Sequence, residues 1–204
     1  MSEKEMVYMI DHQELDILEA ICGIRKYWGI VSDSQMDRAQ MNRRLFEMYQ
    51  KKMIYPEGEF YQITDTYKNL LQYINKADAM MEIKIKGDYQ QDCFCYIRDK
   101  ILIATENARK SGQARYEFIE KNAFGQFLED GEYLPDKNGE NLEDLDYGLT
   151  ITYLSPDGQK QELLDVIEEK GMFSLWYRNG DKEKTEAFSL KRFEDLLWKK
   201  IGEV

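Results

Sequence analysis

Two stretches of the chain repeat the same order of predicted elements, and this repetition constrains the fold more than any other feature. In 80–130 we expect four short strands and a helix: Glu82–Ile85, Gln91–Ile97, Ile101–Ala104, Arg115–Ile119 and helix Phe124–Leu128. In 147–204 we expect the same order: Leu149–Leu154, Gln161–Ile167, Met172–Tyr177, Lys184–Leu190 and helix Phe193–Ile201. The two series correspond at an offset near 70 residues, which predicts a duplicated antiparallel β-meander with a helix after each copy.

One segment of the second copy leaves its secondary structure open. In 161–169, Leu163, Leu164, Val166 and Ile167 could line either a strand or one side of a helix. The repeat favours a strand, whereas the propensities of Glu and Leu favour a helix. A helix there would remove one strand from the proposed duplication.

The first 79 residues predict a helical part that precedes the first meander. Asp11 and Glu14 have the spacing of a capping box at the start of a helix, and Gly23 is a fitting end for that helix. Its apolar stripe is Leu15, Leu18, Ile21 and Cys22. The segment Tyr27–Val31 is expected to be extended.

Two further helices are predicted, with a short hairpin between them. Ser34, with Asp37 three residues on, opens a helix that runs to about Lys52. A turn at Pro56–Gly58 leads to a strand at 59–63. Thr64 or Thr66 then caps a third helix. The stripe of that helix has the clearest helical spacing in the chain: Tyr67, Leu70, Leu71, Ile74 and Ala77.

Length and charge limit the classes of protein. With 204 residues, the chain predicts a single α+β domain, 1–204, with sub-regions 1–79 and 80–130, an acidic linker at 131–146, and 147–204. The formal net charge is −11, and Glu129–Asp146 alone carries eight acidic residues and one lysine. This balance argues against non-specific binding of nucleic acid or of an anionic membrane. Three cysteines make no disulfide framework, and with no signal peptide or membrane span in the sequence a cytoplasmic location is expected.

Candidate catalytic and metal-binding residues are few. His12 is the sole histidine and is expected at the surface. Cys93 and Cys95 share one face of a strand and are expected to pack as small apolar groups. In Asp136–Gly139 the glycine falls at position 4 of a calcium loop rather than position 6. No phosphate-binding glycine motif is present, so we predict no enzyme, no metal and no cofactor.

A second class of function remains open on 34–63. A helix followed by a two-stranded wing could form a winged-helix regulator with a β-rich sensing part, in which Arg43, Arg44, Lys51 and Lys52 face phosphates. The alternative is a solvated helix face whose basic residues balance Glu47 and its neighbours. The acidity of the whole chain favours the second interpretation.

The layout resembles the EspG-type secretion chaperones of type VII (ESX) secretion systems. The similar parts are an opening helix Leu15–Ile21, the segment Tyr27–Val31, a helix ending at Tyr49–Ile54, a helix Tyr67–Ile74, and then the meander. Such proteins are α+β, with a pseudo-twofold repeat of β-meanders and flanking helices. This chain is shorter than typical members and has the acidic segment where helices would precede the second meander.

The resemblance implies a non-enzymatic cytosolic chaperone or adaptor for small helical export substrates, either PE/PPE-like or WxG-type hairpins. We expect contacts from the loops after the third strand of each copy and from an open face of the sheet, where one of the neighbours Trp176 and Tyr177 would point. Each of these residues could equally belong to an ordinary hairpin loop. The candidate partner-binding residues are Glu106, Asn107, Arg109, Lys110, Trp176, Arg178, Asn179 and Asp181.

Overall fold

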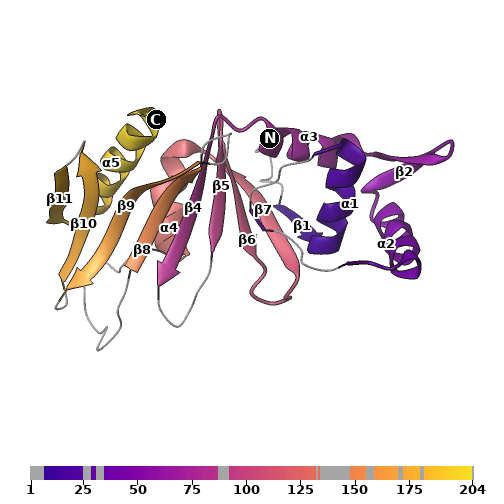
Figure 1. Cartoon of the computed structure of the whole chain (residues 1–204), viewed down its shortest axis with the longest axis horizontal. Coiled ribbons are helices and arrows are strands. Elements are labelled where there is room, and N and C mark those ends of the chain that lie inside the picture. The colour runs from indigo at the N-terminus through magenta and orange to yellow at the C-terminus, as the bar shows by residue number, and fades with distance from the viewer. Residues whose placement is uncertain are drawn as a thin grey trace, which may run out of the picture. The chain divides into compact units, whose positions relative to one another are not determined.

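The computed structural model describes residues 7–24, 29–30, 35–86, 92–131, 133, 148–154, 159–169, 172–179 and 182–203 (Figure 1). The chain divides into two compact units. Unit 1 comprises Met1–Ala77 and Ala104–Glu117, and unit 2 comprises Asp78–Ile103 and Phe118–Val204. Each unit is described by itself below.

The fold is α+β, as the sequence predicts. The helices are α1 His12–Cys22, α2 Arg38–Gln50, α3 Asp65–Asn75, α4 Phe124–Asp130 and α5 Leu190–Glu203, with a 3-10 turn η1 at Lys121–Ala123. The strands are β1 Val7–Asp11, β2 Ile54–Glu57, β3 Phe60–Ile63, β4 Ala79–Lys86, β5 Cys93–Ile97, β6 Ile101–Glu106, β7 Gln113–Ile119, β8 Gly148–Leu154, β9 Lys160–Glu169, β10 Met172–Asn179 and β11 Lys182–Ala187. No helix among the described residues is long and apolar enough to cross a membrane.

Both predicted meanders are present as runs of neighbouring strands. Among the described residues, nine strands form one sheet in the order β1-β7-β6-β5-β4-β8-β9-β10-β11, and β2 and β3 form a separate hairpin. The first strands of the two runs, β4 and β8, pair antiparallel. Several boundaries differ from the prediction by a few residues, and β1 was not expected. The strand expected at Lys184–Leu190 ends at Ala187 because Leu190 begins α5.

Residues 160–169 form strand β9, so the helical alternative is wrong. A β-bulge explains the helix-like pattern. The register shifts between Ile151, which faces Leu164, and Thr152, which faces Glu162, so Leu163 is an extra residue. Both leucines are consequently buried, because a bulge interrupts the alternation of side chains along a strand.

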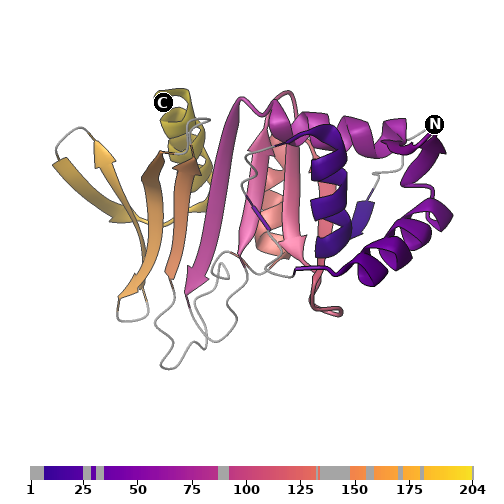
Figure 2. The same cartoon turned by 45° about the vertical axis from the view of Figure 1, so that its right-hand side comes forward.

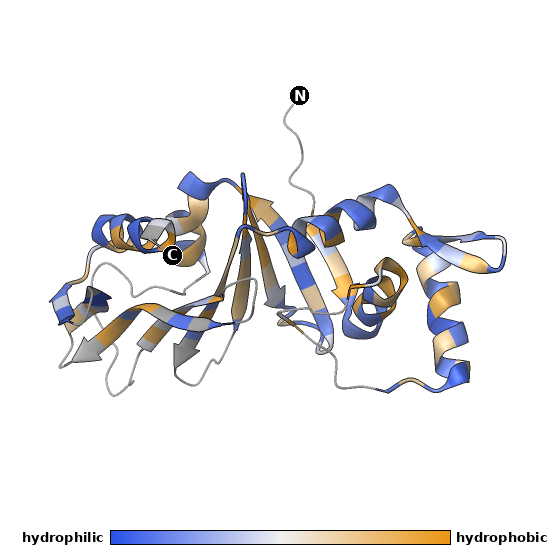
Figure 3. Cartoon of the chain, turned by 45° about the horizontal axis from the view of Figure 1, so that its top comes forward, coloured by the Kyte–Doolittle hydropathy of each residue, from blue (hydrophilic) through white to orange (hydrophobic). Residues whose placement is uncertain are grey.

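One apolar core holds unit 2 together. Alternate residues of its strands point to the side covered by α4 and α5, and Figure 2 shows both helices behind the strands. Phe124 of α4 meets Trp198 of α5 edge-to-face, with ring centroids 5.7 Å apart. Figure 3 shows hydrophobic and hydrophilic residues on different sides of α5, the helix at the C-terminus. The two helices therefore share one side of the sheet and contact each other.

Unit 1 begins with a strand and a helix that share Asp11. The Asp11 carboxylate caps α1, and the Glu14 carboxylate accepts a hydrogen bond from the Asp11 N–H at 3.2 Å, which completes the predicted capping box. Gly23 ends α1 with a φ of 69°, as expected for a left-handed cap. Leu15 and Leu18 of the predicted stripe are buried, whereas Cys22 is exposed.

The second helix begins later than the sequence suggested. Asp37, not Ser34, caps α2, and Gln40 returns the hydrogen bond at 2.9 Å. The capping box that the sequence suggested at Ser34 and Asp37 is therefore formed three residues later, by Asp37 and Gln40. The hairpin turn lies at Gly58, with a φ of 63°, while Pro56 belongs to β2. Thr64 precedes α3 and ties it to the hairpin, since its hydroxyl donates to the Lys52 carbonyl at 3.0 Å.

The acidic linker predicted at 131–146 lies outside the described residues except at its start. There Tyr133 is buried and stacks on Phe127 at 5.6 Å between ring centroids. The solvated segment that the sequence suggested therefore does not begin at Glu129, because α4 extends to Asp130 and Tyr133 belongs to the core. The extended segment predicted at 27–31 also lies outside the described residues for the most part.

Candidate partner-binding surfaces

The first group of predicted contact residues lies in unit 1, on the loop 107–112 between β6 and β7. Asn107 organises this loop. Its amide donates to the Gln113 side chain at 2.7 Å, and its side-chain oxygen accepts from the Arg109 N–H at 3.0 Å. Arg109 and Lys110 are exposed. The loop therefore has a fixed backbone that presents two basic side chains to solvent, while Asn107 itself serves structure.

Glu106 is engaged by a residue that we expected at the surface. His12 is largely buried, and its Nε2 lies 2.9 Å from a Glu106 carboxylate oxygen, without the alignment of a hydrogen bond. The His12 N–H also donates to the Gly112 carbonyl at 3.0 Å. The surface interpretation of His12 is therefore wrong, because the start of α1 packs on the β6–β7 loop.

The second group lies in unit 2 on strands β10 and β11. The Arg178 guanidinium lies 5.9 Å from the centroid of the Trp176 ring and 3.6 Å from the Glu183 carboxylate on the neighbouring strand. Both charged side chains are exposed, so the ion pair contributes little stability. Asn179 ends β10, and Asp181 lies outside the described residues. Trp176 and Arg178 are thus neighbours on one surface.

Trp176 lies on the open face of the sheet, which we define as the side of β8–β11 opposite α4 and α5. Leu175 and Tyr177 are buried in the core, so Trp176 between them points to the other side. The strand register places Asp165 and Thr185 on either side of Trp176. The open face around this half-buried ring is polar, with Ile167 as an exposed apolar neighbour. Its residues on these strands include Thr150, Asp165, Ile167, Ser174, Trp176, Arg178, Glu183 and Thr185.

Tyr177 anchors the opposite side of the same hairpin. Arg192 of α5 donates two hydrogen bonds, each 2.9 Å long, to the Glu186 carboxylate on β11. These bonds, with one from the Tyr177 hydroxyl, lower the pKa of Glu186, and the bond to Glu186 in turn raises the pKa of Tyr177. The hairpin that carries Trp176 is therefore held to α5 by its far side.

An exposed set of aromatic residues in unit 1 was not predicted. Phe60 is 74% exposed and Phe46 is 59% exposed. Tyr49 on α2, and Tyr55 and Tyr61 on the hairpin, are also exposed. The sequence contains a signal, because Met41, Leu45, Met48 and Tyr49 have helical spacing along α2. Of these four residues only Met48 is fully buried. Exposed aromatic residues gathered on adjacent elements are typical of partner-binding surfaces.

The basic residues of α2 are largely bound within unit 1. Glu14 is fully buried, and Lys51 donates a hydrogen bond to its carboxylate. Arg44 lies 3.6 Å from Asp11 and 3.1 Å from Glu47. Charges held in such pairs have little freedom to reach phosphates. This arrangement matches the predicted balance with Glu47 and extends it to a buried carboxylate on α1.

The remaining candidates are groups in the described part of the chain that could hold a metal ion or react. There, no three His, Cys, Asp or Glu side chains are grouped so as to hold a metal ion. Cys93 and Cys95 are fully buried in the apolar core of unit 2, as expected. Burial, assisted by the charge of Asp16, raises the pKa of Glu19 to about 7, and its buried Oε1 has no hydrogen-bond partner among the described residues. Glu19 is thus a partly buried carboxyl whose charged form is disfavoured by burial and by the charge of Asp16.

Comparisons with known proteins supply no family. No family model matches the chain, and no curated protein matches it in sequence.

Proposed function

We propose that this protein is a non-enzymatic cytosolic chaperone or adaptor that binds small helical export substrates of a type VII secretion system. The observation that supports it most is the way the two meanders meet. A duplicated, EspG-like layout requires corresponding elements of the two copies to lie next to each other around an internal twofold axis. In such a layout β4 and β8 would pair antiparallel across the axis, and α4 and α5 would contact each other on one side of the sheet.

The pairing of β4 with β8 fits a twofold relation. Two strands related by such an axis pair antiparallel, and the residues facing each other at the axis are one repeat apart. Glu82 faces Thr152, which lies 70 residues further along the chain. This spacing equals the offset that the sequence pattern suggested.

The helices α4 and α5 also fit a twofold relation between elements about 70 residues apart. Phe124 and Leu128 are fully buried on α4. Phe193 and Leu197, 69 residues later in each case, are fully buried on α5. All four belong to one core, and Gly125 of α4 permits a close approach of the Glu194 side chain from α5. Corresponding helices thus meet on one side of the sheet, and we infer that the other side of β8–β11, against which neither of these two helices packs, receives the partner.

The proposed contact surfaces have the composition that a helical partner needs. The open face offers Trp176 and Ile167 as apolar anchors with Arg178, Asp165 and Thr185 around them. Interfaces of this kind combine a few aromatic anchors with a polar rim. Release at the secretion machine requires moderate affinity, in the range from micromolar to nanomolar, or about −8 to −12 kcal/mol.

The test is co-expression with small helical-hairpin proteins encoded beside the gene, followed by co-purification and calorimetry. We expect a stoichiometric complex that Trp176→Ala weakens about tenfold or more. The matched control is Trp198→Phe on α5, which keeps the open face unchanged. If no such neighbouring protein forms a complex, or if Trp176→Ala binds like the wild type, the proposed function or its proposed surface is wrong.

A winged-helix regulator is the second candidate, because the β2–β3 hairpin does follow α2 directly. The contacts of α2 count against it: Arg44 and Lys51 are bound to carboxylates, and the hairpin carries aromatic rather than basic side chains. A mobility-shift experiment at low salt separates the candidates. Binding to duplex DNA that weakens steeply as salt rises would favour the regulator, since phosphate contacts release counterions.

A further inference from the structure

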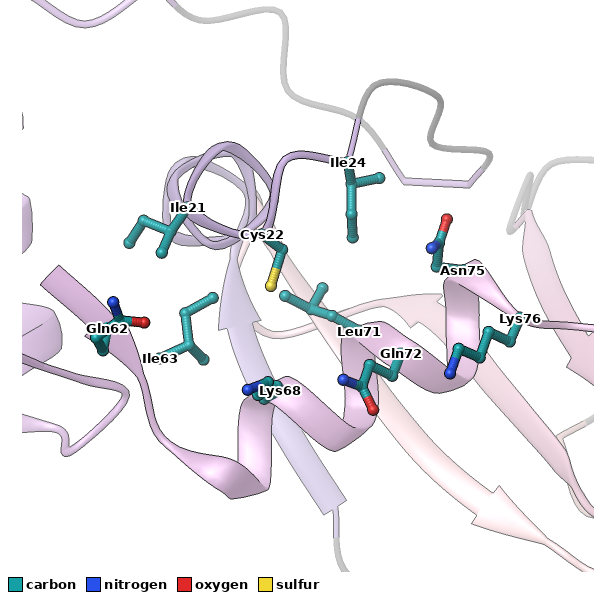
Figure 4. A pocket seen from close by; sticks show the side chains of 10 residues that line it. All are labelled: Ile21, Cys22, Ile24, Gln62, Ile63, Lys68, Leu71, Gln72, Asn75 and Lys76. Carbon is teal, nitrogen blue, oxygen red and sulfur yellow. The ribbon is translucent and has the colours of Figure 1, made fainter.

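A pocket in unit 1 has no part in the proposed function. It lies between the end of α1, strand β3 and helix α3, and has a volume of about 400 Å³. Figure 4 shows its lining side chains: Ile21, Cys22 and Ile24 come from the end of α1, and Lys68, Leu71 and Lys76 come from α3. This volume falls within the usual range of about 300–1,000 Å³ for small-molecule sites.

The lining combines an apolar floor with polar and positively charged groups. Ile21, Ile24, Ile63 and Leu71 supply the apolar part. Three amide side chains, from Gln62, Gln72 and Asn75, supply donors and acceptors. The charged residues of the lining are Lys68 and Lys76, and none of the ten lining residues is acidic. In a chain with a net charge of −11, a pocket with only positive formal charges favours an anionic ligand.

The ends of α1 and α3 oppose this preference but do not overcome it. Both helices end beside the pocket, and a helix C-terminus carries a partial negative charge that costs an anion about 0.3–1 kcal/mol. Several end carbonyls are already occupied: those of Glu19 and Ala20 accept from Ile24 and Gly23, and that of Gln72 accepts from Lys76. Two full lysine charges outweigh the partial charges that remain.

Cys22 lines the pocket and is exposed to solvent there. Figure 4 shows its sulfur directed into the space beside Leu71. Burial raises the pKa of the Cys22 thiol, and the Lys68 charge lowers it to a smaller extent. The thiol is therefore protonated at neutral pH, and a protonated thiol packs as an apolar group rather than acting as a nucleophile or metal ligand. Cys22 lies near Lys68, so one small ligand could contact both an apolar surface and a positive charge.

We propose that this pocket binds a small amphiphilic carboxylate, with its apolar chain between α1 and α3 and its carboxylate at one of the two lysines of the lining, Lys68 or Lys76. Four apolar side chains and the Cys22 thiol would surround the chain, and the amides of Gln72 and Asn75 lie on the same helix as the lysines. This inference goes beyond the proposed function and does not depend on it.

Cys22 provides the test, because it is the exposed cysteine while Cys93 and Cys95 are buried. The rate of its alkylation by N-ethylmaleimide in the folded full chain would be measured with decanoate, acetate or decyltrimethylammonium present. We expect decanoate to slow alkylation several-fold and to saturate, with acetate and decyltrimethylammonium having little effect. Equal protection by the cation, or no protection by millimolar decanoate, would overturn the proposal. Protection by phosphatidylglycerol vesicles alone would also overturn it, by indicating a lipid surface instead.

A double variant tests the lysines without disturbing the core, since both are exposed. In Lys68→Gln/Lys76→Gln we expect about tenfold weaker decanoate binding by calorimetry, because both positive charges of the lining are removed. The matched control, Lys121→Gln/Lys191→Gln, makes the same change of net charge in unit 2 and should bind decanoate like the wild type. Unchanged affinity in the first variant, or an equal loss in the control, would contradict the proposed site.

Discussion

Different interactions stabilise unit 2 as a whole and the contact between α1 and α2 within unit 1. In unit 2 the strands and the helices α4 and α5 share one apolar core that includes Phe124, Phe193 and Leu197. In unit 1 the helix α2 has one fully buried residue, Met48. It also contacts α1 through polar groups: Arg44 and Lys51 lie against the buried Glu14, and Arg44 donates a hydrogen bond to the Gln13 side chain at 2.9 Å. Unit 2 is thus stabilised mainly by apolar burial, and the α1–α2 contact mainly by charge.

This difference explains where exposed aromatic residues are found. A helix held by a charge cluster at one side needs no apolar stripe to stay attached, so Phe46 and Tyr49 of α2 remain at the surface. Aromatic residues of α4 and α5 are instead used within unit 2, as in the contact of Phe124 with Trp198. Unit 1 therefore carries apolar surface that its own fold does not use. The four predictions below test this comparison.

The largest expected effect is the loss of an aromatic side chain from the core of unit 2. Phe193→Ala removes a fully buried ring from α5 and leaves a cavity, at an expected cost of about 3–5 kcal/mol in the free energy of unfolding. Denaturant unfolding measures the change. The matched control is Phe46→Ala, at 59% exposure, which should change stability by about 0.5 kcal/mol or less. Similar losses in both variants would contradict the assignment of Phe193 to a core and of Phe46 to the surface.

The second prediction concerns the charge cluster of unit 1. Glu14→Gln keeps the shape of the side chain but leaves Lys51 and Arg44 without the buried carboxylate, and the capping box loses its charged member. Breaking a buried pair costs about 3–5 kcal/mol, but Lys51 is half exposed, so we expect about 2 kcal/mol. Hydrogen exchange would locate the effect. Faster exchange in α1 and α2 with unchanged exchange in α5 is expected, and equal acceleration in both units would disprove the assignment.

Much of the fold followed from local pattern. Capping boxes, apolar stripes and the order of short strands predicted the five α-helices of the described residues and every strand of both meanders except β9, because those features depend on neighbours in sequence. The strand β1 was missed because Val7–Ile10 is apolar at every position and shows no alternation to recognise. Residues 161–169 stayed ambiguous because the bulge at Leu163 places two adjacent leucines inside, a feature set by the partner strand rather than by the segment itself.

The candidate sites were harder to predict, because side-chain exposure depends on tertiary contacts. Spacing alone placed Trp176 and Tyr177 on opposite faces, and burial in the core then identified Tyr177 as the inner residue. No spacing rule links His12 to Glu106, which lie 94 residues apart in sequence. The pocket beside Cys22 likewise joins α1, β3 and α3. Such sites appear only when the elements are assembled.

The third prediction is a pH dependence that originates in unit 1. Burial and the charge of Asp16 raise the pKa of Glu19 from 4.5 to about 7. Between these values the folded state binds more protons than the unfolded state, so the contribution of Glu19 to stability falls as pH rises. Glu19→Gln should therefore gain roughly 1 kcal/mol over the wild type at pH 8, after allowance for partial exposure, and nothing at pH 4. Unfolding at both pH values measures it, with exposed Glu57→Gln as the control. A gain at pH 4 of the same size would contradict this origin.

The fourth prediction has the smallest expected effect on stability and tests directly whether the exposed aromatic residues of unit 1 serve a partner. Phe60→Ser changes a ring that is 74% exposed on the β2–β3 hairpin, so the free energy of unfolding should change by about 0.5 kcal/mol or less. If the exposed aromatic residues serve a partner, the same variant should weaken the complex with a helical-hairpin substrate by about tenfold. Gln62→Ser, on the same face of the same strand, is the matched control. A loss of stability without a loss of binding would assign Phe60 to the fold of unit 1, and the two units would then differ less than their contacts indicate.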